Sequence, residues 1–274
     1  MSRYIALIAF LLWISQIALH GLFADYLALD QTSKLAAETV IIFVMYFILT
    51  NLFSYKIKFS KSTIILGIAF GFCLFGIFNL YNMISAWLYS ANIISVDYSP
   101  YSSSNVISRD IILPEKDALI EKISTLFIPI VLAPIFEEIV YRCFLYNGLK
   151  IKINLTLSIT IVAIAFAVQH SPDKYLIFGI FSVLLCILID KYRSLSLNIF
   201  SHITYNVIII VNVHLYNLGY VHNFRKDTVF ILNQWLFEGA LGIISIVMIV
   251  LILSAKTRYF SNSVAQDLRF NKSE

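Results

Sequence analysis

The stretch that decides the fold is Ala133-Pro-Ile-Phe-Glu-Glu-Ile-Val-Tyr-Arg142, where two adjacent carboxylates, Glu137 and Glu138, stand inside an apolar segment. Fourteen uncharged residues, Ile123 to Phe136, precede them, and Arg142 follows four residues after the second glutamate. An ionised side chain at the centre of a bilayer costs about 2.5–3.5 kcal/mol on insertion scales, and more by other measures. Two carboxylates in such a place therefore predict a function.

The composition around this stretch is that of an integral membrane protein. Of the 274 residues, 59% are hydrophobic and 13% are charged, whereas soluble domains have about 25% charged residues. The net charge is +4, and its Lys and Arg residues lie beside apolar segments, a pattern that sets membrane orientation and does not indicate a nucleic-acid partner. The three cysteines lie in apolar segments and in an odd number, which argues against a disulfide framework.

Uncharged runs predict an all-α, polytopic membrane helix bundle with about eight transmembrane helices, because about 20 apolar residues span a bilayer. The predicted spans are Tyr4–Ala24, Thr39–Tyr55, part of Ser62–Val96, Ile123–Gly148, a segment ending near His170, Tyr175–Ile189, a segment starting near Ser194, and Trp235–Leu253. The run at 62–96 is too long for one straight span, so we expect its C-terminal part along the membrane surface. Residues 1–274 are predicted to form one membrane domain with a motif-bearing core at about 123–215.

The distribution of positive charge predicts the orientation. With eight spans, both termini lie on one side of the membrane, and that side carries 13 Lys and Arg residues against 7 on the other. Cytoplasmic loops carry the excess of positive charge in membrane proteins. Both termini are therefore predicted to be cytoplasmic.

Glu138 and Arg142 are four residues apart, so they can form an ion pair on one helix. Such a pair would hold Glu138 in place. Glu137 lacks an obvious local cation and is repelled by its neighbour, which suits it to act as a general base. A purely structural ion pair is the alternative interpretation of Glu138 and Arg142.

Two other apolar segments carry polar residues at helical spacing. The sequence FAVQH puts Phe166 and His170 on one helix face, and HITYN does the same with His202 and Asn206. Histidine and asparagine in apolar helices normally face the bundle interior, so we expect all three segments to meet near mid-membrane. The alternatives are a helix-capping role for His170, and simple interhelical hydrogen bonding by His202 and Asn206.

The three segments form the motifs EExxxR, FxxxH and HxxxN, in this order on separate membrane helices. Together they resemble the CAAX protease and bacteriocin-processing family of intramembrane glutamate-dependent endopeptidases, over about Pro134–Asn206. The resemblance implies hydrolysis of a peptide bond in a membrane-associated peptide or protein, prenylated or not. The expected partners are this substrate and the lipid bilayer. The compact chain suits the plasma membrane of a bacterium.

The resemblance also implies a set of catalytic residues and no cofactor. They are Glu137, Glu138, Arg142, His170, His202 and Asn206. By this resemblance Glu137 activates the water that attacks the scissile carbonyl, assisted by His170. His202 and Asn206 donate hydrogen bonds to the oxyanion that develops, and the other two residues orient the site.

Several alternatives stay open at this point. Glu137, His170 and His202 could supply three ligands to a catalytic zinc with an open position, although the sequence has no HExxH motif. A nucleophilic Cys143 is disfavoured, since cysteines buried in apolar helices are usually inert. A non-catalytic membrane binding or bacteriocin-immunity protein would use the same residues to hold helices together. A transporter would use them to relay protons, but we find no internal repeat of the kind many transporters have.

Overall fold

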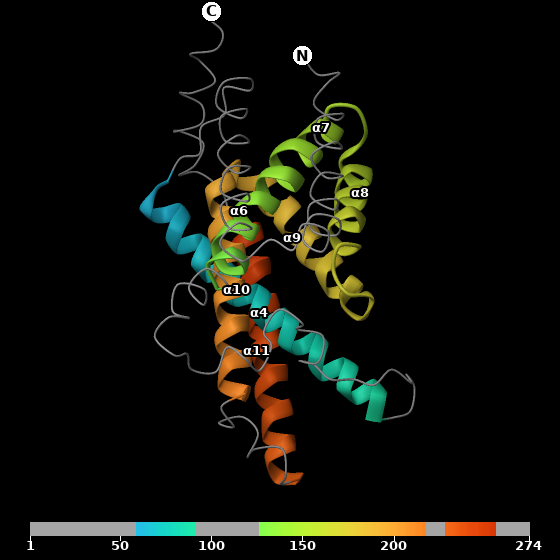
Figure 1. Cartoon of the computed structure of the whole chain (residues 1–274), viewed down its shortest axis with the longest axis vertical. Coiled ribbons are helices and arrows are strands. Elements are labelled where there is room, and N and C mark those ends of the chain that lie inside the picture. The colour runs from blue at the N-terminus through green and yellow to red at the C-terminus, as the bar shows by residue number, and fades with distance from the viewer. Residues whose placement is uncertain (1–58, 91–125, 218–227, 256–274) are drawn as a thin grey trace, which may run out of the picture.

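The computed structural model describes residues 59–90, 126–217 and 228–255, and the regular structure in these ranges is entirely helical (Figure 1). Four helical segments there are long and apolar enough to cross a membrane: Lys61–Ser85, Pro172–Tyr192, Leu195–Asn212 and Leu236–Ser254. For the residues that the structure describes, the predicted all-α membrane architecture is therefore confirmed. The first two predicted spans lie outside the described residues, so the count of about eight stays a prediction.

The described elements follow each other along the chain with short connections, except where undescribed residues intervene. They are α4 (Lys61–Ser90), η4 (Ile128–Leu132), α6 (Ala133–Glu137), η5 (Glu138–Tyr146), α7 (Asn147–Lys150), α8 (Leu155–Ala167), η6 (Pro172–Lys174), α9 (Tyr175–Tyr192), α10 (Leu195–Asn217) and α11 (Thr228–Ser254). Of these, η4 and η5 are π-helices and η6 is a 3-10 turn. The last three predicted spans correspond to α9, α10 and α11 within a few residues, apart from an earlier start of α11.

Helix α4 packs against both α10 and α11 and crosses them in the view of Figure 1. The crossing is close because α4 presents glycines to both partners. A Cβ on Gly71 would lie 2.6 Å from the carbonyl oxygen of Ser201 in α10, and a Cβ on Gly76 would overlap Ser245 in α11. Small residues let helix backbones approach in membranes, where close packing replaces the hydrophobic effect as a source of stability. The glycines thus fix α10, which carries His202, against α4.

Helices α8 and α9 form a hairpin. The side chain of Asn154 accepts a hydrogen bond of 2.8 Å from the backbone N–H of Leu157 and so begins α8. The helix ends at Ala167, earlier than the predicted span, and the proline at position 172 cannot continue it. His170 consequently lies in the turn beyond the helix end, three residues after Ala167, and not at the end of the helix itself.

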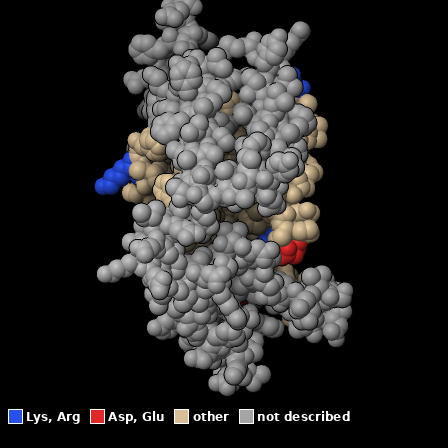
Figure 2. Space-filling view, viewed as in Figure 1, with Lys and Arg blue, Asp and Glu red and all other residues tan. Residues whose placement is uncertain are grey.

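The segment around the two glutamates is helical, as predicted for Ile123–Gly148, but it alternates between π- and α-helix. A π-helix has i→i+5 hydrogen bonds, and such segments occur frequently at functional sites. In η5 the residues Glu138–Phe144 are all buried, including the two charged side chains among them. The charged residues of this element therefore face the interior of the bundle. In the space-filling view of Figure 2, by contrast, the described residues that are visible at the surface are mostly uncharged.

Candidate active site

Glu138 is the centre of a buried polar cluster. Its carboxylate has no exposed surface and receives three partners from two helices. His202 Nδ1 lies 3.0 Å from Oε1, Asn198 Nδ2 lies 3.3 Å from Oε2, and Arg142 Nε lies 3.3 Å from Oε2 as an ion pair. Two hydrogen-bond donors and one cation around the carboxylate stabilise its ionised form, and an ionised carboxylate only accepts hydrogen bonds. His202 must therefore donate through Nδ1.

Glu137 is placed differently from its neighbour. Its side chain retains 16% of its surface exposed, and its Oε2 lies 3.7 Å from His202 Nε2. This separation is too long for a direct hydrogen bond. His202 thus stands between the two glutamates, bound to Glu138 by one ring nitrogen and turned toward Glu137 by the other.

Phe166 is the aromatic centre of the site. Its ring lies 4.7 Å from the guanidinium carbon of Arg142, a cation–π distance, and 6.1 Å from the ring of His202. Its backbone carbonyl accepts a hydrogen bond of 2.9 Å from His170 Nδ1. The first residue of the FxxxH motif therefore supports the buried cation and orients the histidine of the same motif.

His170 is held by stacking as well as by this bond. Its ring centroid lies 3.7 Å from that of Phe178, with an angle of 19° between the rings. Phe178 lies on α9, one turn after the segment Ser171-Pro172-Asp173. Because Nδ1 of His170 donates to a carbonyl, a neutral imidazole keeps its lone pair on Nε2.

Asn206 contacts the π-helix η4. Its Nδ2 donates a hydrogen bond of 2.7 Å to the carbonyl oxygen of Pro129. The N–H that would complete an i→i+5 bond to this carbonyl belongs to position 134, which is proline and has no N–H. Asn206 supplies the missing donor, and its second amide hydrogen is not used in that bond.

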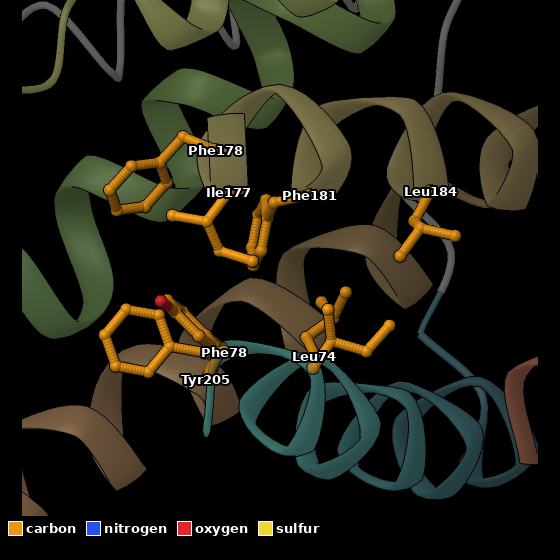
Figure 3. A pocket seen from close by; sticks show the side chains of 8 residues that line it. Leu74, Phe78, Ile177, Phe178, Phe181, Leu184 and Tyr205 are labelled. Atoms are coloured by element: carbon orange, nitrogen blue, oxygen red, sulfur yellow. The ribbon is translucent and has the colours of Figure 1, made fainter. Parts of the chain in front are cut away.

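A small apolar cavity lies between α4, α9 and α10 (Figure 3). Its lining residues are Leu74, Ile77, Phe78, Ile177, Phe178, Phe181, Leu184 and Tyr205. Phe178 stacks on His170, and the ring of Phe181 lies 5.0 Å from that of His202. The volume is about 10 Å³, which is the space of roughly one water molecule. In this structure the cavity is too small for a substrate side chain.

The alternative zinc site is not assembled. Within the part of the chain that the structure describes, no three His, Cys, Asp or Glu side chains are grouped so that they could hold a metal ion. Glu137, His170 and His202 all lie in that part. His202 instead uses one nitrogen for Glu138, and His170 uses one for a backbone carbonyl.

The comparison with known families agrees with the motifs. Residues 120–208 match the family described as Rce1-like, type II CAAX prenyl endopeptidase Rce1-like. The motif-bearing segment is Rce1-like. The predicted family is thereby confirmed over this segment, which contains all six predicted site residues. No curated protein and no solved structure matches the chain.

The match indicates an intramembrane endopeptidase with a peptide or protein substrate in the bilayer. Rce1-like CAAX proteases depend on glutamate and histidine and need no cofactor, so none is assigned to this chain.

Two residues of this cluster were not predicted from the sequence. Asn198 lies one helical turn before His202, and a polar residue in an apolar helix is the same signal that indicated His202 and Asn206. That signal could have found it. Phe178 gave no such signal, because a phenylalanine in an apolar helix is ordinary core or lipid-facing composition.

Proposed function

We propose that this chain hydrolyses peptide bonds within the membrane, with Glu137 as the general base that activates a water molecule. The observation that supports this role is the unequal placement of the two glutamates. Glu138 is fully buried between two hydrogen-bond donors and the Arg142 cation, whereas Glu137 is partly accessible and has no direct hydrogen bond to His202. A general base must reach a water molecule, and Glu137 is the glutamate that water can reach.

In this mechanism Glu137 takes a proton from water, and the oxygen attacks the scissile carbonyl carbon. A carbon–oxygen bond forms, and the carbonyl electron pair moves onto the carbonyl oxygen. The resulting oxyanion is stabilised by positioned hydrogen-bond donors. When it collapses, the carbon–nitrogen bond breaks and the leaving amine takes the proton held by Glu137. The products are a carboxylic acid and an amine, and no further reactant is needed.

The histidines and Asn206 have supporting roles in the proposal. The Nε2 atom of His170 accepts a hydrogen bond from the attacking water and aligns it. Asn206 donates its second amide hydrogen to the oxyanion, while its first remains hydrogen-bonded to the carbonyl oxygen of Pro129. His202 Nε2 joins it as an oxyanion donor in the form of the imidazole that carries a proton on both ring nitrogens, and the proton that Glu137 takes from water is kept for the leaving amine. Glu138 and Arg142 hold these groups in place.

The substrate in the proposal is a membrane-associated peptide or protein, prenylated or not. The catalytic core covers about residues 123–215 of a single membrane domain, in a bacterial plasma membrane with both termini in the cytoplasm. The family match supports the reaction class, and the orientation rests on the distribution of Lys and Arg.

The test compares membrane and secreted peptides by mass spectrometry in cells that express wild type, Glu137→Gln or Glu238→Gln at matched levels. Glu238 lies on α11 outside the polar cluster, so it controls for the same chemical change in the same membrane. We expect defined products in cells with wild type and Glu238→Gln that vanish with Glu137→Gln. If the three peptide profiles agree while a cellular phenotype persists, catalysis is not the function and a membrane binding or immunity role takes its place.

A further inference from the structure

The side-chain amide of Asn198 joins three helices at one buried point. It lies on α10, has no exposed surface, and donates from Nδ2 to Glu138 Oε2 at 3.3 Å and to the carbonyl oxygen of Leu185 on α9 at 2.9 Å. Both partners are acceptors, so the amide nitrogen must face them. The orientation of this side chain is therefore fixed by chemistry.

The partners of Glu138 divide between its two oxygens. Asn198 and Arg142 both approach Oε2, whereas His202 approaches Oε1. With Oε2 occupied from two sides, the carboxylate cannot rotate without losing both contacts. Oε1 is then held in a fixed position for the imidazole of His202, which lies one helical turn after Asn198.

Stability alone does not account well for this asparagine. Its Oδ1 is buried and has no hydrogen-bond partner among the described residues. A buried unsatisfied acceptor costs about 1–3 kcal/mol. A purely structural residue at this buried position would be more stable as an apolar side chain, so the donor to Glu138 has a use other than stability.

We propose that Asn198 is a positioning residue, which locks Glu138 so that Oε1 receives Nδ1–H of His202 and Nε2 of His202 is held toward Glu137. This inference rests on the proposed function, because it assigns a use to the orientation of His202. Loss of Asn198 leaves Glu138 held at Oε2 by the ion pair with Arg142 alone, so the carboxylate and the imidazole bound to it can turn. Small misplacements of catalytic groups lower the turnover number without weakening substrate binding.

The experiment uses the full-length protein in detergent or bilayers, with the substrate found by the peptide comparison above. Asn198→Ala is compared with Asn79→Ala, the same substitution at a buried asparagine whose amide donates to Phe75 in its own helix, α4. We expect kcat of Asn198→Ala to fall about 10- to 100-fold with KM unchanged within about threefold. Asn79→Ala keeps kcat within about twofold. Asn198→Ser, whose hydroxyl is too short to bridge both acceptors, replaces the alanine variant if that one does not fold.

A double-mutant comparison shows whether Asn198 acts through Glu138. In the Glu138→Gln background, where cleavage is expected to be lost, removal of Asn198 should lower Tm by much less than it does in wild type, because the two residues share one interaction. Equal kcat in Asn198→Ala and Asn79→Ala, or Tm shifts of Asn198→Ala and Glu138→Gln that add in full in the double variant, would overturn the inference.

Failure of the proposed function gives a different result. In that case wild type and Glu137→Gln release the same peptides, and no kcat exists to compare. The Tm values of the single and double variants then decide about Asn198. Additive Tm shifts would overturn its coupling to Glu138 as well, whereas non-additive shifts would retain the contact without a catalytic role.

Discussion

His202 Nδ1 and Glu138 Oε1 form a buried hydrogen bond of 3.0 Å between residues 64 positions apart in the sequence. The bond ties α10 to the π-helix η5 and gives the two adjacent glutamates different environments. Glu138 is enclosed by donors, and Glu137 faces the other nitrogen of the same imidazole at 3.7 Å. One histidine thus connects the residue proposed to hold the geometry with the residue proposed to act on water.

The two glutamates should respond differently to the same substitution. Glu138→Gln removes the negative charge from a fully buried pair with Arg142, and breaking such a pair costs about 3–5 kcal/mol. We expect loss of cleavage together with a clear decrease in Tm. Glu137→Gln should lose cleavage with a much smaller change in Tm, because its side chain is partly exposed. Thermal unfolding of the purified proteins measures the difference, and equal Tm shifts would contradict the assignment of roles.

The glycines of α4 provide a test of the helix packing. In Gly71→Ala the new Cβ would lie 2.6 Å from the Ser201 carbonyl oxygen and 2.6 Å from Thr204 Cβ, so α4 and α10 must separate. We expect destabilisation of about 1–3 kcal/mol, typical of overpacking. Gly179→Ala is the control, because its Cβ would lie 4.0 Å from the Cβ of Ala167 on α8, an ordinary van der Waals contact. If Tm falls equally in both variants, the close approach of α4 and α10 is not the cause.

Much of this site could be predicted from one sequence because charge is rare in an apolar chain. Glu137, Glu138 and Arg142 stand out against their segment, and the spacing of the last two correctly predicted an ion pair. His202 was correctly expected to face the bundle interior, where it is buried. The same reasoning predicted α9 and α10 within a few residues, since hydrophobic runs mark membrane helices well.

Other features could not be predicted from hydropathy. The π-helices η4 and η5 depend on local hydrogen bonding, and apolar composition does not distinguish a π- from an α-helix. His170 was expected near the end of a span and on one helix face with Phe166, but α8 ends at Ala167 and the histidine is held from the turn beyond it. Its stacking on Phe178 depends on how the hairpin closes, which is a tertiary contact without a signal in the spacing of residues.

This stacking gives a third prediction. Phe178→Leu keeps an apolar side chain but removes the flat ring that lies 3.7 Å from the His170 ring. We expect kcat to fall about tenfold or more because the imidazole is less well oriented, with a small change in Tm. Phe72→Leu on α4 is the matched control, since its ring is 56% exposed. Steady-state cleavage rates distinguish the two variants, and equal rates would contradict a role of Phe178 in orienting His170.

The bond between Asn206 and Pro129 allows the structural and catalytic roles of Asn206 to be separated. Asn206→Ala removes the side-chain donor to the Pro129 carbonyl, and Pro134 has no N–H that could replace it. The loss should cost about 1–3 kcal/mol. Pro134→Ala restores a backbone N–H at that position. In the Pro134→Ala background we therefore expect Asn206→Ala to lower Tm much less than in wild type. Cleavage should stay lost in the double variant if Asn206 also stabilises the oxyanion. If cleavage recovers together with Tm in the double variant, Asn206 has only the structural role of bonding the Pro129 carbonyl. If Asn206→Ala lowers Tm equally in both backgrounds, the missing N–H of Pro134 is not the reason for that hydrogen bond.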